Sequence, residues 1–178
     1  MECTKCNLHK TRTNIVKGKG NKNAKIFFIG EAPGYHEDKQ GEPFVGKAGK
    51  VFDQMLKSIN LERKDIYLTN VIKCRPPNNR NPTDKEISIC GKYLDKEIDY
   101  IKPKVIVPMG AIATKYILNK HDINFDNMKQ TRGLPIIVEY TIIYPIYHPA
   151  ALIYKKELQS IMQKDMEKIK KLIKSNGD

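Results

Sequence analysis

The chain has 178 residues, and 32 lysines and arginines outnumber 20 aspartates and glutamates, which gives a formal net charge of +12. The length suits one domain, so we expect a single domain over residues 1–178 and a monomer. The charge favours a polyanionic partner such as nucleic acid, with a solubility surface as the alternative. No apolar leader and no run of about 18 apolar residues is visible. We therefore expect no membrane association and an intracellular, cytoplasmic protein associated with the nucleoid.

The predicted strands are apolar runs rich in β-branched and aromatic residues. They lie at 26–29, 66–71, 105–107 and 141–147, and a short strand at 134–139 precedes the last one through a turn at Glu139–Tyr140. The first three runs are continuous rather than alternating, which is typical of strands covered on both faces of a parallel sheet.

Helical patterns separate these runs. Apolar residues share one helix face over 51–59, over 87–101 and over 158–173, and a shorter helix is predicted at 111–118. Thr83 and Glu86 form a possible capping box before the second of these helices. The alternation predicts an α/β fold: a three-layer α/β/α sandwich with a central, mainly parallel four-stranded sheet.

Unusual polar residues follow the ends of three predicted strands. Glu31 lies in "GEAPG" after the first strand, Asn70 in "TNV" at the end of the second, and His148 in "HPA" after the fourth. Parallel sheets bind ligands outside the carboxyl ends of their strands, so these three side chains are expected to share a pocket. The acidic loop of residues 30–46, "GEAPGYHEDKQGEPFVG", also carries an aromatic residue, Phe44.

The four cysteines form a plausible ligand set. Cys3 and Cys6 make a C-x2-C pair, and fifteen residues separate Cys74 from Cys90. Disulfides are unlikely in a reducing compartment, whereas four thiolates suit zinc or an iron–sulfur cluster. The spacing does not choose between these metals, and a redox-active pair with two buried thiols is the alternative.

Taken together, these motifs resemble the family 4, iron–sulfur uracil-DNA glycosylases. The resemblance covers nearly the whole chain and is specific through the joint order of its motifs. The motifs are "GEAPG" followed by "ED", "GEPFVGKAG" (41–49), "TNVIKCRPP" (69–77), the four cysteines and "HPAAL" (148–152).

The resemblance implies a [4Fe-4S] cluster on Cys3, Cys6, Cys74 and Cys90, and hydrolytic release of uracil from single- or double-stranded DNA. Two departures within the wider superfamily matter. The best-known glycosylases carry a water-activating Asp where this chain has Ala32. A related branch has Gln there and forms a covalent DNA adduct through a His in a basic insertion, which the stretch "DKQGEPF" lacks. Turnover is therefore favoured over trapping.

Each candidate residue has a chemical role in such a reaction. An extruded uracil would stack on Phe44 and be read by the amide of Asn70, with the backbone of Glu31 and Ala32 beside it. His148 would donate a hydrogen bond to uracil O2, where negative charge develops, and Glu31 would orient the attacking water. Glu37 or Tyr35 could exclude the methyl group of thymine.

Candidate DNA contacts are assigned more loosely. Leu152 could wedge into the base stack, and packing in the core is its equal alternative. Candidate phosphate contacts are Lys47, Arg75, Arg80, Lys155 and Lys156. The competing function is a non-catalytic nucleic-acid-binding module stabilised by zinc or an iron–sulfur cluster. A third reading, an electron carrier, would leave the predicted pocket without a role.

Overall fold

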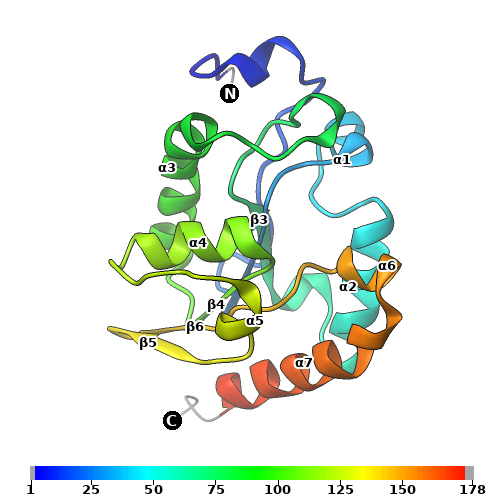
Figure 1. The fold of residues 1–178 in the computed structure, drawn as a ribbon, viewed down its shortest axis with the longest axis vertical. Coiled ribbons are helices and arrows are strands. Elements are labelled where there is room, and N and C mark those ends of the chain that lie inside the picture. The colour runs from blue at the N-terminus through cyan, green and yellow to red at the C-terminus, as the bar shows by residue number, and fades with distance from the viewer. Residues whose placement is uncertain (1–2, 175–178) are drawn as a thin grey trace.

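The apolar runs form the central sheet of the computed structural model, which describes residues 3–174 (Figure 1). Six strands follow the order β1-β3-β2-β4-β6-β5. The strands are β1 (Lys19–Gly20), β2 (Ile26–Gly30), β3 (Tyr67–Asn70), β4 (Val105–Pro108), β5 (Ile136–Val138) and β6 (Thr141–Ile143). The four inner strands pair in parallel, and β1 and β5 pair antiparallel at the edges. The predicted fold class is confirmed, but the sheet has six strands rather than four, because β1 and β5 add an antiparallel strand at each edge.

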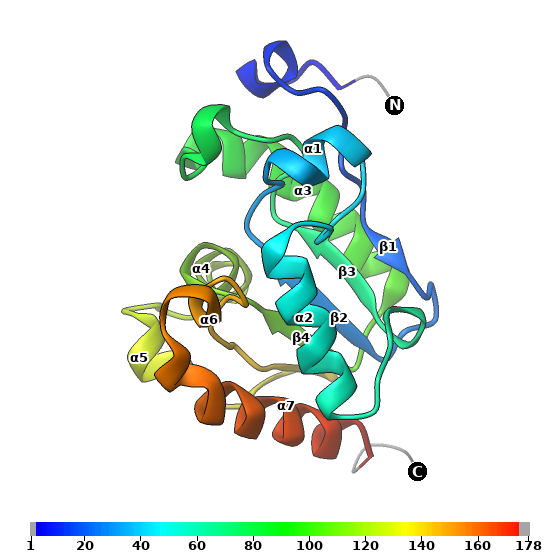
Figure 2. The ribbon, with the colours of Figure 1, turned by 90° about the vertical axis from the view of Figure 1, so that its right-hand side faces the viewer.

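Helices cover both faces of this sheet. They are α1 (Tyr35–Gln40), α2 (Lys47–Ser58), α3 (Asp84–Ile101), α4 (Ala111–Asn119), α5 (Met128–Thr131), α6 (Ala151–Tyr154) and α7 (Gln159–Lys174). Short 3₁₀ helices are η1 (Asn7–Lys10), η2 (Arg63–Asp65), η3 (Pro77–Asn79) and η4 (Lys156–Leu158). Figure 2 shows α2 in front of the strands and α3 behind them. None of the helices in residues 3–174 is long and apolar enough to cross a membrane.

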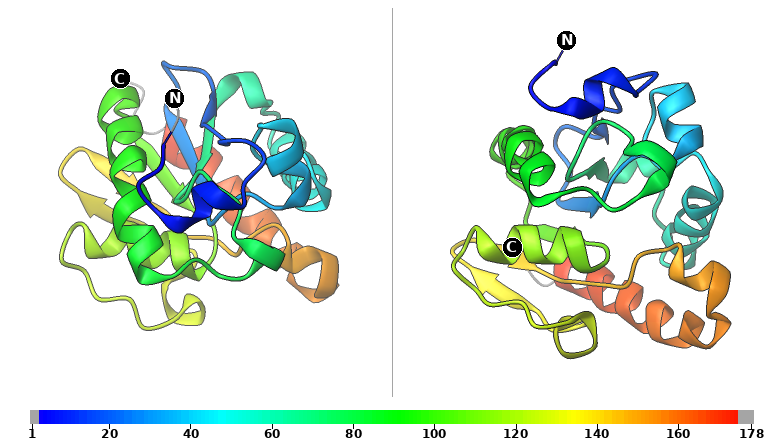
Figure 3. Two further views of the ribbon diagram at one scale, coloured as in Figure 1. Left: turned by 90° about the horizontal axis from the view of Figure 1, so that it is seen from above. Right: turned by 45° about the horizontal axis from the view of Figure 1, so that its top comes forward.

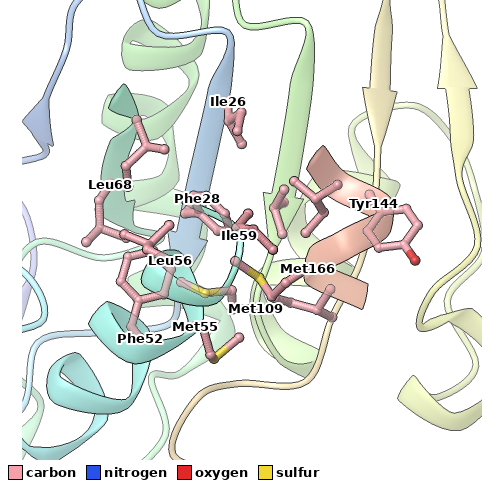
Figure 4. Packing of buried hydrophobic residues seen from close by; sticks show 14 of the residues in the cluster. Ile26, Phe28, Phe52, Met55, Leu56, Ile59, Leu68, Met109, Tyr144 and Met166 are labelled. Atoms are coloured by element: carbon pink, nitrogen blue, oxygen red, sulfur yellow. The ribbon is translucent and has the colours of Figure 1, made fainter. Parts of the chain in front are cut away.

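Alternate residues of β2 divide the core into two clusters. Ile26 and Phe28 point to one face and pack with α2 and α7, as Figure 4 shows. Phe27 and Ile29 point to the other face and pack with α3 and α4. All four side chains are at most 2% exposed. This burial on both faces is the reason that the strands read as continuous apolar runs.

Two sequence predictions are confirmed in detail. Thr83 Oγ1 accepts from the Glu86 amide and the Glu86 carboxylate accepts from the Thr83 amide, so the capping box starts α3. The hairpin turn also falls where it was expected, because Val138 pairs with Thr141 and leaves Glu139–Tyr140 between β5 and β6.

The sequence analysis missed several short elements, among them α1, α5, α6 and the edge strand β1. The segment interpreted as one loop, residues 30–46, contains α1, which is short, mostly polar and bounded by Gly34 and Gly41. Gly41 adopts a φ of 71° at the helix end, a conformation that glycine adopts without strain. The edge strand β1 has two exposed residues and no apolar pattern, so periodicity could not reveal it.

The N-terminal segment lies over the region between β3 and α3, as both views in Figure 3 show. The amide of Val16 donates to the Lys73 carbonyl, and the buried Asp38 carboxylate accepts from the amides of Thr13 and Asn14. These bonds bring the C-x2-C pair close to the segment that carries Cys74.

Candidate active site

The carboxyl ends of the parallel strands surround a cavity of about 370 Å³. Gly30 pairs with Asn70 at the ends of β2 and β3, which places Glu31 beside Asn70. His148 follows β6, and Phe44 comes from the connection between α1 and α2. The structure thus brings together the predicted side chains of Glu31, Phe44, Asn70 and His148. The residues lining the cavity are Glu31, Ala32, Gly34, Glu37, Phe44, Ala48, Asn70, Asn79, His148 and Ala150.

Phe44 forms a wall of this cavity and is also part of the core. Its ring centroid lies 5.4 Å from that of Phe52 and 5.6 Å from that of His148, with the His148 ring nearly parallel. A Cβ at Gly30 would lie 2.7 Å from the Phe44 ring and would also collide with the Asn70 amide oxygen. Glycine at position 30 is therefore required for both side chains to reach the cavity.

Arg63 holds the backbone of Phe44 from outside the cavity. Its guanidinium donates to the carbonyls of Pro43 and Phe44 and pairs with Asp53, with 2.6 Å between Nε and Oδ1. Phe44 has a φ of 55°, which costs a non-glycine residue of order 1–3 kcal/mol. The guanidinium fork satisfies the carbonyls of this strained segment and fixes the ring.

Glu37 holds the same segment from the other side. Its carboxylate accepts from the amides of Val45 at 2.9 Å, Gly46 at 2.8 Å and Gly34 at 3.1 Å. These bonds explain the acidic "ED" motif structurally, since Glu37 orders the loop. Of the two residues considered for excluding thymine, Glu37 lines the cavity, whereas Tyr35 is not among its lining residues and is 51% exposed.

Asn70 is 3% exposed, and a buried ionic network lies behind it. Lys73 Nζ donates to the Asn70 carbonyl at 2.7 Å, to Thr69 Oγ1 at 2.6 Å and to Glu97 Oε2 at 2.7 Å. Burial lowers the pKa of Lys73, and the Glu97 carboxylate opposes that shift. Sequence reasoning missed both charged residues; the available signal was a lysine directly before Cys74.

His148 is held as a neutral hydrogen-bond donor. Burial lowers its pKa to about 4, and the nearby Glu37 charge only partly opposes this. Its Nδ1 accepts from the Ala150 amide at 3.2 Å, so the ring proton is assigned to Nε2. The imidazole can therefore donate a hydrogen bond without being a cation.

Glu31 contributes a carboxylate to the cavity in a partly dehydrated position. Burial raises the pKa of this carboxyl group. A raised pKa makes the ionised form a better proton acceptor near neutral pH. The adjacent Ala32 presents only a methyl group to the same cavity.

The four cysteines line a second cavity of about 320 Å³, and Lys73 and Glu97 also line it. All four thiols are free of disulfides. Donors point at the sulfur atoms: Arg12 Nη1 lies 3.3 Å from Cys74 Sγ, and the Lys73 amide lies 3.2 Å from Cys90 Sγ. Within residues 3–174, no three Cys, His, Asp or Glu side chains are grouped tightly enough to hold a single metal ion.

The predicted DNA contacts differ in solvent exposure and in the partners that they already have. Lys47 and Lys155 are exposed, as is Lys156, whereas Leu152 is partly buried against the core cluster of α2 and α7. Arg80 forms a two-pronged ion pair with Glu86 and so supports the start of α3.

Comparison with known proteins agrees with this geometry. The family model of the uracil DNA glycosylase superfamily matches residues 17–174, and the chain belongs to that superfamily. Within it, the chain is a member of the type-4 uracil-DNA glycosylases.

Three curated relatives support the narrower placement, and each is named type-4 uracil-DNA glycosylase. That of Sulfurisphaera tokodaii is 49% identical over 97% of this chain and 80% of its own length. The Archaeoglobus fulgidus protein is 48% identical over 97% of this chain and 88% of its own length. The Thermotoga maritima protein is 42% identical over 99% of this chain and 92% of its own length.

Proposed function

We propose that this protein is a monofunctional uracil-DNA glycosylase that extrudes uracil from DNA and hydrolyses its N-glycosidic bond, which initiates base excision repair. The observation that carries the proposal is the convergence of Glu31, Phe44, Asn70 and His148 on one cavity at the strand ends. A non-catalytic binding module would not need a buried amide, a neutral imidazole and a carboxylate facing the same space. The whole chain acts as one domain in this proposal.

Selection of uracil rests on Asn70 and Phe44. The Asn70 amide donates to uracil O4 and accepts from N3–H, while the base stacks on the Phe44 ring. Cytosine presents the reverse pattern, and each unpaired polar group left in a buried site costs about 1–3 kcal/mol. Glu37, fixed by three backbone amides, borders the space in which a thymine methyl group would lie.

Bond cleavage uses His148 and Glu31. As the bond between C1′ and N1 breaks, its electron pair moves onto uracil, and the Nε2–H of His148 stabilises the charge at O2. A donor of this kind contributes about 3–4 kcal/mol. Glu31 orients the water that bonds to C1′ and accepts one of its protons, and its charge stabilises the positive sugar. The uracil anion takes a proton from solvent on release.

The direct test is an oligonucleotide panel containing uracil opposite guanine, opposite adenine or unpaired, together with thymine, cytosine and hypoxanthine. We expect uracil release that leaves an abasic site and an intact strand, and no release of thymine or cytosine. A panel in which every glycosidic bond stays intact, from a folded protein, would contradict the function.

We further propose that Cys3, Cys6, Cys74 and Cys90 hold a [4Fe-4S] cluster. A tetrahedral zinc site, with Zn–S bonds of about 2.3 Å, needs sulfur atoms roughly 3.8 Å apart. The four thiols instead line one cavity without forming a single-ion group in the described chain, as suits a cluster with one cysteine on each iron. When bound, the cluster supplies a structural link between the N-terminus and the segment around Cys74.

Metal analysis and colour distinguish the two metals. We expect a brown protein with broad visible absorption and about four irons and four sulfides per chain. Replacing Cys74 by Ser should remove the colour and make the N-terminal segment sensitive to limited proteolysis. A colourless protein with one zinc per chain would contradict the cluster and leave the proposed glycosylase chemistry untouched.

A further inference from the structure

Two arginines of the segment between β3 and α3 have different surroundings in the structure. Arg80 donates from Nη1 to Glu86 Oε2 at 2.9 Å and from Nη2 to Glu86 Oε1 at 2.8 Å. Its Nη1 also donates to the Asn81 carbonyl at 2.9 Å. Both terminal nitrogens of this guanidinium thus already donate to acceptors at the start of α3. Arg80 is therefore a poor candidate for binding a ligand.

Arg75 is fixed in place, yet its outer nitrogens are available. Its Nε donates to Asn79 Oδ1 at 2.7 Å, and its Cζ lies 5.2 Å from the centre of the Tyr35 ring. Across residues 3–174, no acidic side chain forms an ion pair with it, and no acceptor is assigned to Nη1 or Nη2. The guanidinium is therefore oriented by contacts that leave its fork unoccupied.

This guanidinium lies at the edge of the cavity assigned to uracil. Its partner Asn79 lines that cavity, and so does Gly34, which immediately precedes Tyr35. Tyr35 is 51% exposed, and Lys39 Nζ adds a second cation 5.9 Å from the same ring. The phosphates beside an extruded base lie at the rim of the cavity that holds the base, and Asn79 and Gly34 link Arg75 and Tyr35 to that cavity.

A planar guanidinium with both NH2 groups free matches the oxygens of a phosphodiester, and an arginine already stacked on an aromatic ring loses less side-chain entropy when it binds. We propose that Arg75, which stacks on Tyr35 and donates a hydrogen bond to Asn79, binds a DNA phosphodiester that flanks the extruded uridine. This inference rests on the proposed function and adds a binding site outside the uracil cavity. Tyr35, considered above for excluding thymine, acts here as the support of Arg75.

The experiment measures binding of a single-stranded oligonucleotide whose uridine carries a 2′-fluoro group. The fluorine destabilises the positive sugar, so the bond survives and binding is measured apart from cleavage. The variants are Arg75→Gln, Tyr35→Leu and Tyr35→Phe. The control is Lys22→Gln, which removes one exposed positive charge just before the amino end of β2, whereas the cavity lies at the carboxyl ends of the strands.

We expect Arg75→Gln to weaken binding about tenfold, as for loss of a charge-assisted hydrogen bond. It should also reduce the slope of log K against log salt by about one unit, the signature of a lost phosphate contact. Tyr35→Leu should weaken binding roughly threefold with the slope retained, and Tyr35→Phe, which keeps the ring, should bind as the wild type does.

Wild-type binding by Arg75→Gln or Tyr35→Leu would overturn the proposal, as would an equal loss in Lys22→Gln, since that would indicate general attraction to the basic surface. Cleavage separates this result from the proposed function. The concentration of uracil-containing DNA that gives half-maximal cleavage should rise in Arg75→Gln by about the same factor as its dissociation constant. Failure of the wild-type protein to release uracil would instead contradict the glycosylase assignment.

Discussion

The uracil cavity and the cysteine cavity are built in opposite ways. In the uracil cavity, Asn70 ends β3, Glu31 directly follows β2 and His148 follows β6. The side chains of Glu37 and Arg63 bond to the backbone around the fourth residue, Phe44. In the cysteine cavity, only Cys90 lies in a regular α-helix, whereas Cys3, Cys6 and Cys74 lie in irregular segments. The first site is organised by the sheet, whereas the second is formed by irregular segments and one helix.

Lys73 connects the two cavities. Its ammonium group bonds the carbonyl of Asn70, and its backbone amide bonds Cys90 Sγ. Substitutions in the uracil cavity should therefore slow uracil release with little change in the free energy of unfolding. Substitution of Lys73 should mainly lower the free energy of unfolding.

The largest expected effect is on cleavage. Asn70→Ala and His148→Ala should each slow single-turnover uracil release by about 10²–10³-fold, because each removes polar contacts to the reacting base. Binding of uncleavable DNA and the midpoint of urea unfolding should change little. His121→Ala is the matched control, since His121 is exposed and outside the cavity. Retained activity in Asn70→Ala would remove this account of base selection.

The next effect is on stability. Lys73→Met should lower the free energy of unfolding by about 3 kcal/mol, because it leaves the Glu97 carboxylate without its partner in a largely buried position. Adding Glu97→Leu should restore much of that loss. Urea unfolding monitored by circular dichroism provides the measurement.

Lys19→Met is the control for that experiment. It breaks the exposed pair with Glu42, and we expect a change within about 0.5 kcal/mol. Equal losses in the buried and exposed variants would contradict the structural link between the two cavities.

A smaller effect concerns the position of Phe44. Arg63→Lys keeps a positive charge but cannot bond two carbonyls and Asp53 together, so the strained loop loses its support. We expect inhibition by free uracil to weaken about tenfold, or about 1.4 kcal/mol, with a smaller change in unfolding. Lys64→Ala, the neighbouring exposed side chain paired with Glu62, should leave inhibition unchanged. Unaltered inhibition in Arg63→Lys would show that the ring is held by core packing alone.

A further effect is a gradual dependence of stability on pH. The folded pKa of His148 is lowered to about 4, so between pH 6.5 and 4 the unfolded chain binds a proton that the folded chain does not. This contribution to stability is present above pH 6.5 and is lost as the pH falls. The free energy of unfolding should therefore decline more steeply in the wild type than in His148→Asn, and parallel curves would contradict a buried neutral imidazole.

Prediction from sequence succeeded where the signal was local. The capping box of Thr83 and Glu86 joins residues three positions apart, and the parallel strands have continuous apolar runs, so both could be recognised without coordinates. α1 was missed because its mostly polar sequence carries no apolar stripe. Arg63 and Lys73 were missed as supports of the site because their partners, Phe44 and Glu97, lie in other elements of the chain.

The sequence by itself determined which polar residues stand at the carboxyl ends of which strands, because side-chain periodicity and chain order specify the sheet. Only the tertiary structure decided that Phe44 is clamped from two sides, that the His148 proton sits on Nε2 and that Arg75 rather than Arg80 has a free guanidinium fork. Those outcomes depend on hydrogen bonds between segments remote in sequence, and such bonds are settled only when the helices and the sheet pack together.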